Sequence, residues 1–181
     1  AGLNVLRVIN EPTAAILSSD IDLKGRDSRI VAVTDVGCGT TDVSICEISD
    51  GVTEVLASYG DVFLGGQNYD AALTDWIAED FMKDHPGTDL REDRMALARI
   101  TEAAARAKIE LSTMNETDIS LPYISFIDNV PQMYTASISR AVFEHATAML
   151  TQHVTDCLKL AVKKAGKEMK DLDEVLLVGG S

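Results

Sequence analysis

The chain has 181 residues, of which 46% are hydrophobic and 25% charged, and its formal net charge is −13. This composition is typical of a globular protein, and no apolar run reaches the roughly 20 residues that a membrane-spanning helix needs. Without such a run we expect no membrane association. The acidic excess repels phosphate backbones, so we expect no nucleic-acid partner. A local phosphate site is still possible, because backbone N–H groups can hold an anion without net positive charge.

The three cysteines show no paired spacing, and the three histidines form no metal-ligand pattern. An odd number of cysteines without such a framework is typical of reduced thiols. We therefore expect an intracellular protein.

Hydrophobic patterning predicts strands and a short helix in the first third of the chain. A β-branched run at residues 5–9 predicts a strand, and Pro12 after the acidic Glu11 predicts the first turn of a helix. A nearly continuous apolar run then predicts a strand buried on both faces, and two further strands follow it as successive hairpins. These three strands are expected at 30–36, 42–48 and 52–59.

Apolar residues at helical spacing dominate the remainder of the chain. Helices are expected at 69–81, 91–111 and 142–162, weaker strands at 118–124 and 133–138, and a last strand at 175–178. The alternation of strands and helices indicates an α/β fold. The last strand runs into a glycine turn, which normally leads into another element, so we expect a fragment of a longer protein.

The sequence VTDVGCGTTD, at residues 33–42, ends an apolar strand at an acidic residue and continues with two glycines. A loop with Gly37 and Gly39 can point several backbone N–H groups at one anion. Thr40 can donate its hydroxyl to a phosphate oxygen, and Asp35 can hold Mg²⁺ or its waters beside the phosphate. On pattern alone, a phosphate site and a simple hairpin turn both remain open.

Two further features carry weaker signals. Residues 179–181 (Gly-Gly-Ser) form a second turn after a buried strand, and two such turns could line one cleft. Ala105, Lys108 and Ser112 share one face of a helix, where a solvated surface is the alternative. Glu11 on its own is most simply a residue that starts a helix.

Five blocks of sequence stand in a characteristic order. They are INEPTAA (9–15), DVGCGTTDVS (35–44), GDVFLGGQNYD (60–70), ARAKIELS (105–112) and VLLVGGS (175–181). Together they resemble the ATPase domain of the 70-kDa heat-shock protein chaperones, a family of the stress response. The resemblance covers nearly the whole chain, and KIELS and LPYI are similar to the bacterial DnaK and mitochondrial branch.

The resemblance implies the actin/hexokinase-like (ribonuclease H-like) ATPase fold, an α/β lobe with a mixed sheet and an inserted helical subdomain. It implies a crossing segment from the first lobe at 1–24, a lower subdomain with the phosphate and adenosine turns at 25–64 and 139–181, and an upper helical subdomain at 65–138.

The resemblance also implies ATP or ADP with Mg²⁺ as cofactors. The catalytic positions would be Asp35, Glu11 and Thr40, with Asp35 serving the metal through water. The nucleotide-binding positions would be Gly37, Cys38, Gly39, Thr40, Gly66, Gln67, Lys108, Ser112, Gly179, Gly180 and Ser181.

The partners implied by the resemblance are the rest of the ATPase domain, a peptide-binding domain, a J-domain co-chaperone, a nucleotide-exchange factor and unfolded client proteins. The implied location is a bacterial-type cytoplasm or the mitochondrial matrix. Half of the transition-state clamp would lie in the missing first lobe, so we expect these 181 residues alone to hydrolyse ATP poorly.

Several residues depart from the family pattern. Cys38 replaces the middle of three glycines, Gln67 and Ala105 replace acidic residues, and Thr34 is polar where the family is usually apolar. Losing the carboxylate at position 105, which would bind ribose, would weaken nucleotide binding by about 1–3 kcal/mol. Two functions remain open: an ATP-driven chaperone, and a degenerate non-hydrolysing relative that acts as a regulator or partner platform. A sugar kinase of the same superfold is disfavoured.

Overall fold

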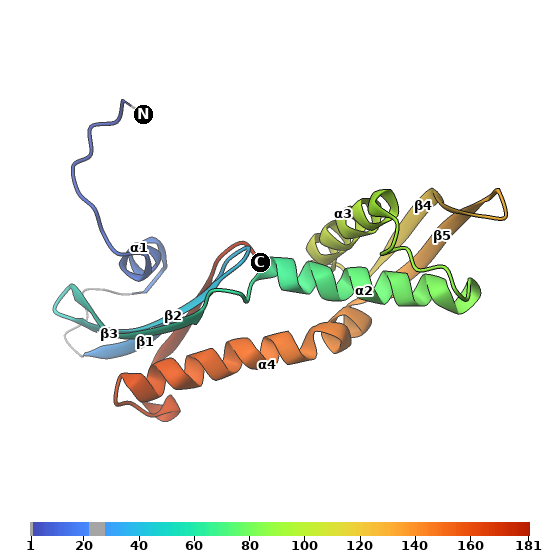
Figure 1. Cartoon of the computed structure of the whole chain (residues 1–181). Coiled ribbons are helices and arrows are strands. Elements are labelled where there is room, and N and C mark those ends of the chain that lie inside the picture. The colour runs from blue at the N-terminus through green and yellow to red at the C-terminus, as the bar shows by residue number, and fades with distance from the viewer. Residues whose placement is uncertain (1, 22–27) are drawn as a thin grey trace. The chain divides into compact units, whose positions relative to one another are not determined.

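The computed structural model describes residues 2–21 and 28–181, and the chain divides into two compact units. The first unit is Ala1–Gly66 with His153–Ser181, and the second is Gln67–Gln152 (Figure 1). The expected boundary between residues 24 and 25 lies outside the described residues, so the subdomains implied by resemblance stay a prediction. Each unit is described by itself.

A four-stranded mixed sheet forms the centre of the first unit. Its strand order is β3 (Val52–Asp61), β2 (Thr41–Ser49), β1 (Arg29–Val36) and β6 (Glu174–Val178). The pairs β1–β2 and β2–β3 are antiparallel. The pair β1–β6 is parallel, although the whole second unit separates the two strands in the sequence. This sheet agrees with the α/β fold expected from the sequence.

Helices cover both faces of β1, which explains its continuous apolar sequence. Successive residues of a strand point to opposite faces, so one set of side chains meets α4 (Arg140–Lys164) and the other meets α1 (Glu11–Ser18). The α4 side buries Ile30, Ala32, Val43, Ile45, Cys157, Ala161 and Val162, and the α1 side buries Ile16, Val31, Val33, Cys46 and Ile48. The two hydrophobic layers fix the strand whose end carries Asp35.

The second unit packs helices against a two-stranded antiparallel sheet. Its elements are α2 (Gly66–Asp84), α3 (Arg94–Leu111), β4 (Glu116–Ile127), β5 (Val130–Ser139) and the first half of α4. Its core includes Leu73, Ile77, Phe81, Ile100, Leu111, Ile119 and Ile138. The carboxylate of Asp93 caps α3 by accepting hydrogen bonds from the backbone N–H groups of Met95 and Ala96 at 2.7 and 3.3 Å.

Most elements predicted from the sequence are confirmed, with ends that differ by a few residues. The two weaker strands are longer than expected, because Asp128 and Asn129 both adopt positive φ (51° and 62°) and close a tight hairpin between them. None of the helices in the described part of the chain is long and apolar enough to cross a membrane.

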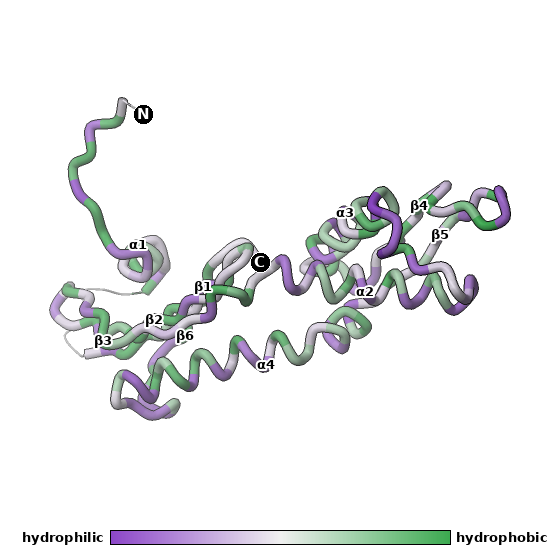
Figure 2. Tube along the Cα trace, in the orientation of Figure 1, coloured by the Kyte–Doolittle hydropathy of each residue, from purple (hydrophilic) through white to green (hydrophobic). Residues whose placement is uncertain are grey.

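The strand predicted at residues 5–9 is wrong. This segment has no regular secondary structure, and the side chains of Val5, Leu6 and Val8 are exposed. Hydrophobic residues are spread along it (Figure 2). A strand needs a neighbouring backbone to satisfy its N–H and C=O groups, and no described strand pairs with this segment.

Two buried threonines of the sheet allow a matched test of hydrogen bonding. The Thr41 hydroxyl donates to the Leu64 carbonyl at 2.8 Å, whereas the Thr34 hydroxyl has no partner among the described residues. We expect Thr34→Val to raise the free energy of unfolding by about 1 kcal/mol and Thr41→Val to lower it by about the same amount. Urea denaturation measures both changes, and shifts of the same sign would contradict this account.

Candidate functional site

Two turns meet at one edge of the mixed sheet. Strands β1 and β6 are parallel neighbours, with Asp35 opposite Val178, so their carboxyl ends lie side by side. The Ser181 N–H donates to the Val36 carbonyl at 3.2 Å, which ties the second turn to the end of β1. The two glycine turns therefore lie together; that they line one cleft stays a prediction.

Gly179 makes the closest approach between these turns. Its φ is +103°, and a Cβ atom placed on it would lie 2.2 Å from the Val36 carbonyl oxygen and 2.7 Å from Asp35 Oδ1. A side chain at this position would therefore collide with the end of β1 and with the acidic side chain itself. The backbone of the second turn thus forms one wall beside Asp35.

The hairpin turn between β1 and β2 is closed by its first glycine. The Gly37 N–H donates to the Thr40 carbonyl at 2.8 Å, and the Gly37 carbonyl accepts from the Gly66 N–H at 2.9 Å. The next three backbone N–H groups have no acceptor among the described residues, and they belong to Cys38, Gly39 and Thr40. Three consecutive free N–H groups are a suitable lining for an anion.

Cys38 fits this turn without backbone strain. It is exposed, and it is absent from the residues with positive φ in the described chain. The neighbouring Gly65 is more constrained, because a Cβ atom there would lie 2.6 Å from the Gly39 nitrogen and 2.7 Å from the Cys38 carbonyl carbon. The turn therefore tolerates a side chain in its middle but not on the segment packed against it.

Carboxylates gather at the same edge of the sheet. Glu11 from α1, Asp35 and Asp42 line a small cavity of about 30 Å³ with Ser44. Asp35 and Asp42 stand directly opposite each other in the antiparallel pair, where like charges are unfavourable. No group of three or more acidic, histidine or cysteine side chains in the described part of the chain is arranged to hold a metal ion alone. This donor set suits a hydrated cation better than a fully protein-bound one.

The remaining predicted site residues lie in the second unit. Lys108 Nζ pairs with Asp70 Oδ1 at 2.8 Å, and both side chains are largely buried. The Ser112 hydroxyl donates to the Ile109 carbonyl at 2.6 Å, at the C-terminal end of α3. Gln67 is exposed in the first turn of α2, where it lines a groove of about 420 Å³ with Asp70.

Asp70, Asp42 and Gly65 carry no signal in the sequence that sets them apart as site residues. Asp70 lies inside the GGQNYD motif, and its buried contact with Lys108 was the missing signal. Asp42 lies directly opposite Asp35 in the β1–β2 hairpin. Gly65 packs against the backbone of Gly39. Such roles become visible only once strand register and turn packing are known.

The mixed sheet, with a hairpin turn and a glycine turn at the ends of neighbouring parallel strands, is that of an actin-like ATPase lobe. The model of the Hsp70 protein family matches residues 1–181, and the chain belongs to this family.

Three bacterial proteins illustrate the similarity. The chain is 50% identical to Chaperone protein DnaK of Deinococcus proteolyticus over 183 residues, which cover 100% of this chain and 28% of that protein. It is 47% identical over 180 residues to Chaperone protein DnaK of Thermosipho melanesiensis and to that of Thermosipho africanus, covering 99% of this chain and 30% of each. The chain thus spans less than a third of the length of the curated relatives it matches.

Replacing either glycine of the second turn by alanine tests the close approach to β1. We expect Gly179→Ala to destabilise the domain by about 1–3 kcal/mol, because the new Cβ atom meets the Val36 carbonyl and the φ is positive. Gly180→Ala is the matched control, since nothing lies within 4 Å of its Cβ position. Thermal unfolding of the two variants measures the difference, and equal melting temperatures would refute this packing.

The three thiols are expected to differ sharply in reactivity. Cys38 is exposed, whereas burial raises the pKa of Cys46 to about 11, and burial together with the charges of Asp61 and Asp156 raises that of Cys157. At pH 8, brief alkylation of the native protein should therefore modify Cys38 first, because the two buried groups stay as neutral thiols. Peptide mapping by mass spectrometry before and after denaturation checks this order, which early labelling of Cys46 would contradict.

Proposed function

We propose that this chain is part of the nucleotide-binding domain of an ATP-driven protein-folding chaperone. The observation that carries the proposal is the turn at residues 38–40, whose three N–H groups have no acceptor among the described residues and which follows the end of β1, where Asp35 lies against Gly179. Membership of the Hsp70 family and similarity to DnaK chaperones support it.

The phosphate side of the proposed site uses residues of the first unit. The N–H groups of Cys38, Gly39 and Thr40 would hold phosphate oxygens of ATP or ADP, with the Thr40 hydroxyl as a further donor. Asp35 would hold Mg²⁺ through its waters, and the ion would neutralise the charge that develops on the phosphates. Glu11, which reaches the same small cavity, would orient the water that attacks the terminal phosphate.

The other nucleotide-binding residues are proposed from the resemblance, separately for each unit. In the first unit, Gly37 would belong to the phosphate loop, Gly66 would lie near the ribose and phosphates, and Gly179, Gly180 and Ser181 would form the adenosine-side turn. In the second unit, Gln67 would lie near the ribose and phosphates, and Lys108 and Ser112 would contact adenosine. Asp70 would act as a positioning residue, because its carboxylate fixes the ammonium group of Lys108.

The wider assembly follows from the same proposal. ATP hydrolysis would gate a peptide-binding domain that holds unfolded clients, with a J-domain co-chaperone and a nucleotide-exchange factor as partners. The bacterial relatives favour a bacterial-type cytoplasm as the location. The chain on its own would turn over ATP poorly, because the first-lobe half of the phosphate clamp is not part of it.

The non-hydrolysing alternative is not supported. It rested on Cys38, Gln67 and Ala105, but the chain is about half identical to DnaK chaperones along its whole length. Cys38 also fits its turn with an ordinary φ, so the loss of glycine does not by itself distort the loop.

Nucleotide affinity of the full-length protein tests the proposal. We expect the wild type to bind Mg·ADP and to hydrolyse ATP, Cys38→Gly to change ADP affinity little, and Ala105→Glu to tighten it by roughly fivefold to 150-fold. The last gain corresponds to the 1–3 kcal/mol of one regained ribose hydrogen bond. Calorimetric titration with ADP and a steady-state phosphate-release assay are the measurements.

Glu102→Gln is the control for a change of charge on α3, and it should leave ADP affinity unchanged. This exposed carboxylate lies on α3 but outside the groove lined by Gln67 and Asp70. ADP binding that appears only in the double variant Cys38→Gly/Ala105→Glu would show that the natural protein is not a chaperone ATPase.

A further inference from the structure

A second groove lies in the helical unit; none of the residues assigned to nucleotide lines it, although Asp75 also lines the groove of Gln67 and Asp70. It runs between the middle of α2 and the start of α4 and has a volume of about 690 Å³, which is within the usual range for ligand sites. Three of its lining residues are alanines, so small side chains on both helices leave the seam unfilled. The groove therefore results from the small side chains that the two helices present to each other.

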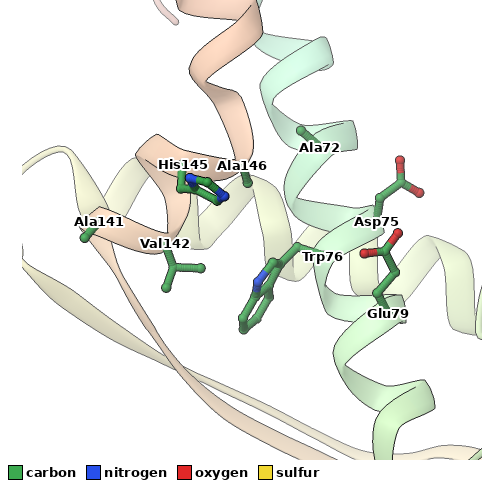
Figure 3. Close-up of a pocket in the computed structure, with 8 residues that line it drawn as sticks. All are labelled: Ala72, Asp75, Trp76, Glu79, Ala141, Val142, His145 and Ala146. Carbon is green, nitrogen blue, oxygen red and sulfur yellow. The ribbon is translucent and has the colours of Figure 1, made fainter.

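Trp76 is the largest side chain that lines this groove. Its ring stands between the two helices and faces the wall formed by Val142 and His145 (Figure 3). The side chain packs partly against the core of the unit, and the remaining ring surface is open to the groove. An indole face is the strongest aromatic partner for a cation.

The formally charged side chains that line the groove are both acidic. Asp75 and Glu79 line it one helical turn apart, and none of its lining residues is a lysine or an arginine. Arg91 already pairs with Asp75 at 2.9 Å, but Glu79 has no ion-pair partner among the described residues. Glu79 follows Trp76 by three residues on the same helix, so of the two acidic residues it is the one left to pair with an incoming cation near the ring.

We propose that this groove docks an arginine side chain presented by a basic segment of a partner protein. A guanidinium group can stack on the Trp76 ring and donate two parallel hydrogen bonds to the Glu79 carboxylate, whereas a lysine ammonium is a hydrated point charge that does neither as well. The net charge of −13 adds long-range attraction for a basic segment. The proposal does not rest on nucleotide binding, so its failure would leave the proposed ATPase untouched.

The test follows Trp76 in the full-length protein labelled with 5-fluorotryptophan. The ¹⁹F resonance that disappears in Trp76→Phe identifies the reporter. Acetyl-Gly-Arg-Gly-Arg-Gly-amide should shift this resonance in a saturable way, and the peptide with lysine in place of arginine should bind at least threefold more weakly. Equal affinities for the two peptides, or no shift at millimolar peptide, would overturn the proposal.

The role of the Glu79 carboxylate is tested with a matched pair of variants. Glu79→Gln should weaken binding of the arginine peptide by about threefold to fivefold, which is the effect of removing one exposed ion pair. Glu102→Gln removes the same charge from an exposed position of α3 outside the groove and should leave the affinity unchanged. Equal losses in the two variants would mean general charge attraction and would also overturn the proposal.

Discussion

The parallel pairing of β1 with β6 is the constraint on which the site in the first unit depends. The second unit separates these strands in the sequence, yet they are joined in register with Asp35 opposite Val178. The pairing is anchored at its other end by Asp173, whose carboxylate accepts from the Ile30 N–H at 2.7 Å and whose own N–H donates to the Ile30 carbonyl at 2.9 Å. Because a slip by one residue would turn every side chain to the opposite face, this anchoring decides which groups reach the edge.

Register explains why the acidic residues and the free N–H groups occur together. Asp35 is the next-to-last residue of β1, so its side chain lies at the mouth of the turn while the N–H groups of residues 38–40 follow it. The parallel neighbour delivers the Gly179 turn to the same place, and α1 delivers Glu11. A mixed sheet can thus collect a turn with unsatisfied N–H groups, carboxylates and a second backbone wall from three distant parts of the chain.

Much of this fold was predictable because periodicity and turn residues are local signals. The apolar run of β1, the hairpins and the long amphipathic helices could all be read directly from the sequence. The segment at 5–9 could not, because a β-branched run forms a strand only where a partner backbone is present. The ion pair between Lys108 and Asp70 was also unpredictable, because it joins two helices whose packing is a tertiary property.

Cys38 shows where the sequence constraint on the turn resides. A loop usually written with three glycines suggests that each glycine supplies an unusual φ, but residues 37, 38 and 39 are absent from the positive-φ positions of the described chain. The need for glycine falls instead on the segments that press against the loop, at Gly65 and Gly179, where a Cβ atom would lie 2.7 Å or less from backbone atoms of the loop or of β1. A thiol in the middle of the turn points to solvent and leaves the N–H of its own residue without a partner in the described structure. A side chain at position 38 is therefore compatible with the backbone conformation of this turn, whereas a side chain at either of the two packing glycines would not be.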